Sequence, residues 1–117
     1  MDKKPIKRIP LLFYRSVGDR EPVREWLKGL EYLDRHAIGM DLMRVQWRWP
    51  IGMPLCRPLG QGLWEVRTNL PSNRIGRVLF CLHEGALVAL HGFIKKTEKI
   101  PDNELKIAIQ RKEDLKK

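Results

Sequence analysis

Apolar positions follow a helical period in the first half of the chain, after one short strand. The run IPLLFY, residues 9–14, is apolar with aromatic content and predicts a first strand. Apolar residues then recur at the i, i+3, i+4 and i+7 spacing of one helix face: Val23, Trp26, Leu27 and Leu30. A second, longer helix is marked by two neighbouring apolar stripes: Leu33, Ala37, Met40 and Trp47, and Ile38, Leu42, Val45 and Trp49. This helix should end near Arg48, because Pro50 cannot continue it.

The second half of the chain predicts strands and one closing helix. The segment PIGMPLCRPLGQG, residues 50–62, is rich in proline and glycine and marks the crossing from helices to sheet. Three strand-like runs follow it: LWEVRTNL (residues 63–70), RVLFCLH (77–83) and ALVALHGFI (86–94). Only Glu84 and Gly85 join the last two runs, so these must form an antiparallel hairpin. In the tail, an initial proline and aspartate and one apolar face predict a final helix: Leu105, Ala108 and Ile109.

These elements occur in the order β-α-α-β-β-β-α, which predicts an α+β fold with one antiparallel sheet and helices packed on a face. A chain of 117 residues can build one small domain and is too short for two, so we expect a single domain over residues 1–117. The N-terminus lacks the apolar run of a signal peptide, and no segment approaches the roughly 20 apolar residues of a membrane span. We therefore expect a cytoplasmic protein.

Side-chain alternation along the predicted strand at residues 63–70 separates the side chains that pack in the core from those that face solvent. Trp64, Val66, Thr68 and Leu70 share one side of the strand. The other side carries Leu63, Glu65, Arg67 and Asn69, and we expect this set to look outward. Arg67 would then be available to bind a ligand.

The charge of the chain points to an acidic or polyanionic partner. Lysine and arginine number 23 and aspartate and glutamate 14, which gives a formal net charge of +9. Between Arg44 and Phe80 the cations are all arginines: Arg44, Arg48, Arg57, Arg67, Arg74 and Arg77. Fork-shaped guanidinium groups suit bidentate contact with phosphate oxygens. The alternative is a solvated basic surface, which fits Arg44 and Arg48 equally well.

The two cysteines do not indicate a metal site or a disulfide scaffold. Cys56 and Cys81 stand alone, without C-x-x-C spacing or a companion cluster of histidines. We expect core thiols in a reducing compartment, and no metal or cofactor.

Several motifs together resemble a known family. They are Arg57-Pro-Leu59, GLWEVR (residues 62–67), RVLF (77–80), LHGFIKKTEKIP (90–101) and a closing helix with Ile107, Ala108 and Arg111. In order and spacing this set, over residues 55–113, resembles the phage-derived HigB-like branch of the RelE/ParE toxin superfamily. The resemblance implies a compact RelE-like domain and the toxin of a type II toxin–antitoxin system. It also implies a cognate helix-turn-helix (HigA-like) antitoxin as partner and cleavage of mRNA on the ribosome.

Metal-free RNA cleavage requires a base for the 2′-hydroxyl proton, cations to neutralise the phosphorane-like transition state, and an acid for the leaving 5′ oxygen. By resemblance, Arg67 and Arg77 are expected to contact the scissile phosphate. Lys95 and Lys96 match the basic pair at which relatives place a phosphate ligand or a proton donor. The alternative for Arg77 is a salt bridge to Glu65.

Other residues complete the candidate site. His91 has an unperturbed pKa of roughly 6.5, suited to acid–base work, although in an apolar strand a hydrogen-bonded core role is favoured. Arg57, Arg74 and Lys99 are expected to extend the RNA track; Arg57 alternatively caps the loop before the sheet. The final helix lacks the tyrosine that RelE members carry. Proton transfer would then fall to the lysines, to His91 or to another group, or else the protein does not cleave RNA.

Two other functions remain open from the sequence. A ParE-like chain would inhibit DNA gyrase by binding it, without catalysis. A non-enzymatic nucleic-acid-binding phage protein would stack bases on Trp47, Trp49 and Trp64. Tryptophans at such periodic positions are more often core residues.

Overall fold

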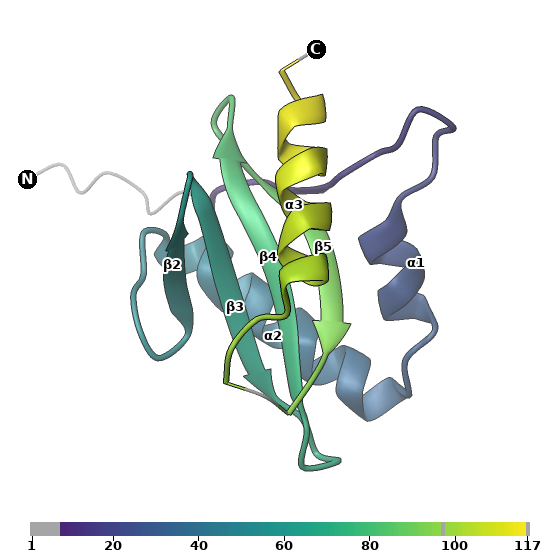
Figure 1. Cartoon of the computed structure of the whole chain (residues 1–117). Helices are drawn as coiled ribbons and strands as arrows, with labels where there is room; N and C mark the ends of the chain where they lie inside the picture. The colour runs from purple at the N-terminus through teal and green to yellow at the C-terminus, as the bar shows by residue number, and fades with distance from the viewer. Residues whose placement is uncertain (1–7, 97, 117) are drawn as a thin grey trace, which may run out of the picture.

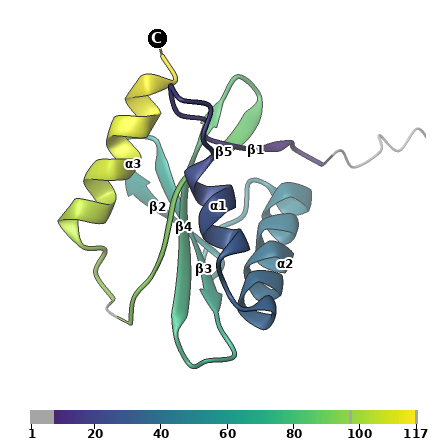
Figure 2. The same ribbon diagram turned by 90° about the vertical axis from the view of Figure 1, so that its right-hand side faces the viewer.

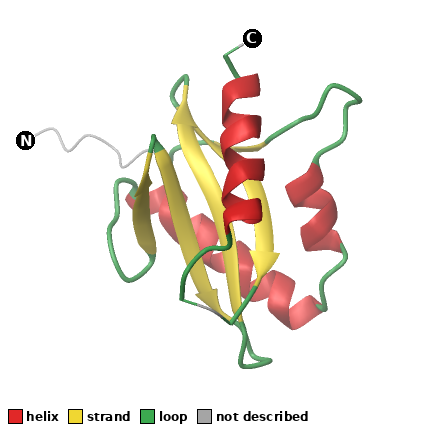
Figure 3. Cartoon of the chain, in the orientation of Figure 1, coloured by secondary structure: helices red, strands yellow, loops and turns green. Residues whose placement is uncertain are grey.

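The computed structural model describes residues 8–96 and 98–116. Figure 1 and Figure 3 show an open sheet with helices beside it. The elements follow the chain as β1 (Leu11–Phe13), α1 (Pro22–Lys28), α2 (Tyr32–Arg48), β2 (Cys56–Gly60), β3 (Leu63–Asn69), β4 (Ile75–His83), β5 (Ala86–Ile94) and α3 (Asp102–Asp114). Within the described stretches, no helix combines the length and the apolar character that a membrane crossing needs.

The five strands form one sheet in the order β1-β5-β4-β3-β2. Strands β2 to β5 pair antiparallel with their sequence neighbours, as the short connections between them require. Strand β1 is the exception and pairs parallel to β5, with Leu11 opposite Leu87. A parallel neighbour needs a long crossover, which the whole segment between β1 and β5 supplies.

Strand β2 is one strand more than the sequence pattern predicts. It lies within the proline- and glycine-rich segment 50–62, which we expected to be a crossing loop. A proline cannot donate a ladder hydrogen bond, so proline within a strand is confined to edges and bulges. Strand β2 meets both conditions: it is the edge of the sheet, and its register to β3 shifts between Pro58 and Gly60.

Helices cover both faces of the sheet, and each face has its own core (Figure 2). On one face α1 and α2 pack through Val23, Leu27, Ile38, Leu42 and Val45 against Val66, Val78, Phe80, Leu87 and Ala89. On the other face α3 packs through Leu105, Ala108 and Ile109 against Leu63, Leu79, Cys81, Val88, Leu90 and Phe93. The α+β class and the packing of helices on the sheet are thus confirmed, with α3 on the face opposite to α1 and α2.

Helix α2 uses only one of its two predicted apolar stripes for packing. Ile38, Leu42 and Val45 are buried against the sheet. Leu33, Met40 and Trp47, from the other stripe, are exposed. The two stripes, which we expected side by side, lie on opposite sides of the helix at 100° per residue. A helix packed on a sheet buries one stripe of roughly 100° width, so the other stripe stays in solvent.

Candidate nucleic-acid interface

The face of β3 that we expected to look outward lies partly beneath α3 and the segment that leads to it. Leu63 and Glu65 are buried, Arg67 is half-buried and Asn69 is exposed. The expectation was therefore wrong for the first two residues, because α3, which follows β4 and β5 in the chain, covers that end of the face. The opening toward solvent begins at Arg67.

Three arginines lie close together on this face, and two of them share one buried carboxylate. In the strand register Arg57 of β2 stands opposite Glu65, and Arg67 stands opposite Arg77 of β4. The carboxylate of Glu65 lies between two guanidinium groups, with Oε1 3.2 Å from Nη2 of Arg57 and Oε2 3.4 Å from Nε of Arg77. A single buried acid is thus shared by two cations, one at the edge of the sheet and one in its centre.

Arg77 is buried completely and does not reach the surface. It forms the salt bridge to Glu65 that was the alternative to a phosphate contact. Burial lowers the pKa of the Arg77 guanidinium, Glu65 opposes this shift, and the neighbouring Arg67 adds to it. Its Nη1 and Nη2 atoms are buried and have no hydrogen-bond partner among the described residues. Arg77 therefore contributes positive charge from below the surface and holds Glu65 in place.

Arg67 is the arginine of this group with the weakest protein partner. One quarter of its side chain is exposed, and its Nη1 lies 3.6 Å from Oε2 of Glu98. Glu98 is itself 84% exposed, and such surface pairs contribute about 0–1 kcal/mol. Like charges directly opposite on two strands repel, so Arg67 beside Arg77 forms a local surplus of positive charge. A phosphate oxygen could replace the Glu98 carboxylate at little cost.

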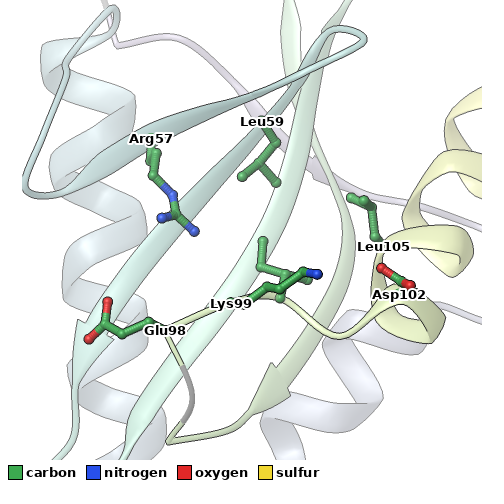
Figure 4. Close-up of a pocket in the computed structure, with 7 residues that line it drawn as sticks. Arg57, Leu59, Glu98, Lys99, Asp102 and Leu105 are labelled. Carbon is green, nitrogen blue, oxygen red and sulfur yellow. The ribbon is translucent and has the colours of Figure 1, made fainter.

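A groove of about 440 Å³ opens beside this cluster (Figure 4). Arg57 and Leu59 project into it from β2, across from Glu98 and Lys99 of the segment before α3. The side chain of Lys99 points toward the first turn of α3. The lining residues are Arg57, Leu59, Glu98, Lys99, Ile100, Asp102 and Leu105. The floor of the groove is apolar, and the two cations of the lining are balanced by the two acids, so the positive surplus beside the groove comes from Arg67 and Arg77. An apolar floor next to such a surplus suits a nucleotide, whose base is apolar and whose phosphate is anionic.

The other predicted cations lie in different places. Lys95 and Lys96 are exposed directly after β5, and neither lines the groove. The backbone N–H of Lys95 donates to the carbonyl of Ile75, which ties this segment to the start of β4. Arg74, in the turn between β3 and β4, donates from Nη2 to Oδ2 of Asp34 at 3.0 Å. Because Asp34 belongs to α2, Arg74 is held toward the opposite layer and stands outside the arginine cluster.

His91 is covered by α3, away from the groove. A register shift adds Leu90 to β5 as an extra residue, which turns both Leu90 and His91 toward α3. Nη1 of Arg111 donates to the carbonyl of Leu90 at 2.8 Å and lies 3.4 Å from Nδ1 of His91. Arginine cannot accept a hydrogen bond, so Nδ1 must accept and the proton belongs on Nε2, which faces Glu104 at 3.4 Å. The ring also stacks on Phe93. These contacts favour the core role for this histidine.

The environment of His91 predicts a pH dependence of stability. Burial lowers the pKa of His91, and the nearby Glu104 carboxylate only partly opposes this shift. As the pH falls below the unfolded-state pKa of about 6.5, the unfolded chain therefore binds a proton at His91 more readily than the folded chain does. The free energy of unfolding then falls as the pH falls. We expect urea unfolding to show a smaller loss of stability from pH 7 to pH 5 in His91→Gln than in the wild type. The exposed His36→Gln is the control, and an equal loss in all three proteins would contradict the assignment.

Several contributors to this region are not evident from sequence pattern. Glu98, before α3, and Asp102, at the start of α3, line the groove. The only feature of the sequence that indicates them is that they closely follow Lys95 and Lys96. Tyr14 donates its hydroxyl to Asp114 at 2.8 Å, and Cζ of Arg111 lies 5.5 Å from the centroid of the Tyr14 ring. Burial raises the pKa of the Cys56 thiol to about 11, and Cys81 is buried as well. Among the described residues, no group of three histidine, cysteine, aspartate or glutamate side chains could hold a metal ion.

Comparison with known proteins places this arrangement in a family. No curated protein matches the sequence. The profile of the family described as phage derived protein Gp49-like (DUF891) matches residues 25–113, a stretch that runs from α1 to the last turn of α3 and includes every strand except β1. Since this match covers most of the chain, the protein belongs to the phage-derived Gp49-like family.

Proposed function

We propose that the chain is the toxin of a type II toxin–antitoxin system and that it cleaves mRNA on the ribosome. The observation that carries this proposal is the surplus of arginine around Glu65 at the edge of a nucleotide-sized groove. Membership of a phage-derived family and the HigB-like order of motifs support it. Beyond membership of the Gp49-like family, the proposal assigns the chain to the HigB-like branch of the RelE/ParE toxin superfamily.

The proposed reaction is attack of an RNA 2′-hydroxyl on the adjacent phosphorus, without a metal ion. Arg57 and Arg67 would bind the non-bridging phosphate oxygens and stabilise the charge that develops in the transition state. Arg77 would add to the positive potential from beneath, because a buried charge is weakly screened by solvent. Proton transfer falls to the exposed Lys95 and Lys96. One of them, in its neutral form, accepts the 2′-hydroxyl proton, and the other donates a proton to the 5′ oxygen as its bond to phosphorus breaks. His91, enclosed under α3, would hold α3 on the sheet.

The proposed neutralising partner is a helix-turn-helix (HigA-like) antitoxin with an acidic segment. Two partly exposed arginines, Arg57 and Arg67, and a formal charge of +9 attract such a segment. If the segment covers Arg57 and Arg67, it competes directly with RNA for the same guanidinium groups. Inhibition would then need no change in the shape of the toxin.

Induction of the protein in a bacterial host tests the proposal. We expect growth arrest together with new transcript 5′ ends inside translated reading frames, and loss of both in the Arg67→Ala variant. Removal of a single transition-state donor lowers catalysis by about 100-fold or more, while the surface pair of Arg67 with Glu98 contributes little to stability. The charge-matched control is Arg48→Ala, on α2 at the opposite side of the sheet, which should retain both effects.

Each other outcome points to a different function. Growth arrest without new 5′ ends would overturn the nuclease assignment in favour of a target such as gyrase. New ends that persist when translation is blocked would exclude dependence on the ribosome. The absence of both growth arrest and cleavage would mean that the fold of this family binds nucleic acid without being toxic.

A further inference from the structure

The outward side of α2 carries a continuous apolar stripe. Its side chains are exposed by 39 to 65%: Tyr32, Leu33, Met40, Met43 and Trp47. At 100° per residue all five fall within one side of the helix, opposite the buried Ile38, Leu42 and Val45. From Tyr32 to Trp47 the stripe is about 22 Å long, since an α-helix rises 1.5 Å per residue. We call this set the α2 stripe.

The α2 stripe differs from an ordinary solvated helix face. The exposed side of a surface helix is normally polar and charged, whereas the sector of α2 that the stripe spans holds no lysine, arginine, aspartate or glutamate. The one polar side chain in this sector, His36, stacks on Tyr32 with 5.8 Å between ring centroids. Figure 2 shows α2 as the outermost layer on its side of the sheet. Contiguous exposed apolar patches of this kind mark surfaces that bind another molecule.

The charges beside the α2 stripe indicate what covers it. Arg35 flanks one side, and Arg44 and Arg48 flank the other. Asp41 forms an ion pair with Arg44, so this border keeps a positive excess. An occupant with acidic side chains beside an apolar stripe matches this pattern in both respects.

The two basic occupants that the chain itself offers fit poorly. The N-terminal residues 1–7, MDKKPIK, carry three lysines and one aspartate, so they would bring positive charge to a positive border. A second copy of the chain would place two molecules of charge +9 against each other. We infer that the α2 stripe is a docking surface for an amphipathic helix of a different protein, whose apolar face is flanked by aspartate and glutamate.

This docking surface is independent of the proposed nuclease site. The α2 stripe lies on the α1–α2 side of the sheet, whereas Arg57, Arg67 and the groove lie on the α3 side. A helix bound to α2 would leave the arginines open. Packing of the two helices side by side would bury the five apolar side chains, and the arginines at the border would select the acidic partner.

A titration with synthetic helices tests the inference without reference to RNA cleavage. The probe is an amphipathic peptide of about 18 residues, or five turns, with a leucine stripe flanked by glutamates. A matched peptide carries lysines in place of the glutamates. We expect the acidic peptide to shift the NMR signals of α2 in the ¹⁵N-labelled full chain, and to bind at least about tenfold more tightly than the basic peptide.

Variants of the chain locate the binding. The double substitution Met40→Ser, Trp47→Ser removes apolar side chains that point to solvent, and should weaken the acidic peptide at least about tenfold without disturbing the fold. The control Leu82→Ser removes an exposed leucine on β4 and should leave the affinity unchanged. The NMR spectra of the variants alone report whether each remains folded.

Four outcomes would overturn the inference. They are no binding at millimolar peptide, equal affinity for the acidic and basic peptides, equal losses in the double variant and in Leu82→Ser, and shifts confined to Arg57 and Arg67. Sedimentation of the chain without peptide tests whether a second copy of the chain binds the α2 stripe. A dimer that dissociates in the Met40→Ser, Trp47→Ser variant would assign the α2 stripe to a second copy instead.

Discussion

Replacement of Glu65 by alanine is expected to destabilise the protein by about 3–5 kcal/mol, because it leaves a buried arginine without its counter-charge. The side chains of both Glu65 and Arg77 are fully buried, and the carboxylate Oε2 lies 3.4 Å from Nε of Arg77. Arg57 would lose its partner as well, but one third of its side chain is exposed and water can solvate it. The cost therefore comes mainly from Arg77. Urea unfolding of the variant and the wild type measures it.

Two further variants separate charge from shape in this pair. Glu65→Gln keeps the size of the side chain and removes the charge, so it should also destabilise the protein strongly. The double variant Glu65→Leu, Arg77→Met removes both charges and should recover most of the loss, since an apolar pair can replace a buried ion pair. A loss below about 1 kcal/mol for Glu65→Ala would show that Arg77 is not held by this carboxylate.

A methyl group at position 92 is expected to destabilise the protein by about 1–3 kcal/mol, because the space is already filled. A Cβ atom on Gly92 would lie 2.3 Å from Cζ3 and 2.4 Å from Cε3 of the Trp26 indole. Trp26 sits on α1, which packs against β5 through this contact, so the indole ring or the whole helix would have to shift. Thermal or urea unfolding of Gly92→Ala measures the effect.

The control for Gly92→Ala is the same substitution in open space. A Cβ on Gly39 would meet nothing within 4 Å, and alanine is the better helix former by about 0.8–1.0 kcal/mol, so Gly39→Ala should stabilise the protein. Trp26→Leu in the Gly92→Ala background should recover part of the loss by making room. Equal stability of Gly92→Ala and the wild type would mean that α1 does not press on β5 at this point.

Periodicity predicts the elements of this fold where each buries a single face. Val23 and Leu27 of α1 lie at helical spacing, and both are buried as expected. Strand β2 escapes prediction because an edge strand needs only one hydrogen-bonding partner and tolerates Pro58, which reads as a loop residue in sequence. The two stripes of α2 look alike in sequence, because hydrophobicity does not reveal whether a face meets this chain or another molecule.

The sequence predicts the positive charge of the candidate site but not how deeply its arginines are buried. The sequence places Arg67 and Arg77 on neighbouring strands, but their exposure depends on α3 and the segment 95–101, whose path no periodicity describes. The bulge at Leu90 likewise interrupts the alternation of side chains between the two faces of β5, so that His91 lies under α3. Glu98 joins Arg67 across about 30 residues of chain, a contact that only the folded sheet creates.

Arg67 carries the central claim, and cleavage of a defined message in a purified translation reaction tests it most directly. The account predicts that the wild-type chain cuts the message only when ribosomes translate it, and leaves a 5′-hydroxyl and a 2′,3′-cyclic phosphate, the products of 2′-hydroxyl attack. Arg67→Ala should cut about 100-fold more slowly, while the charge-matched Arg48→Ala should cut at the wild-type rate. An intact message with the wild-type chain, or equal cleavage by wild type and Arg67→Ala, would contradict the account.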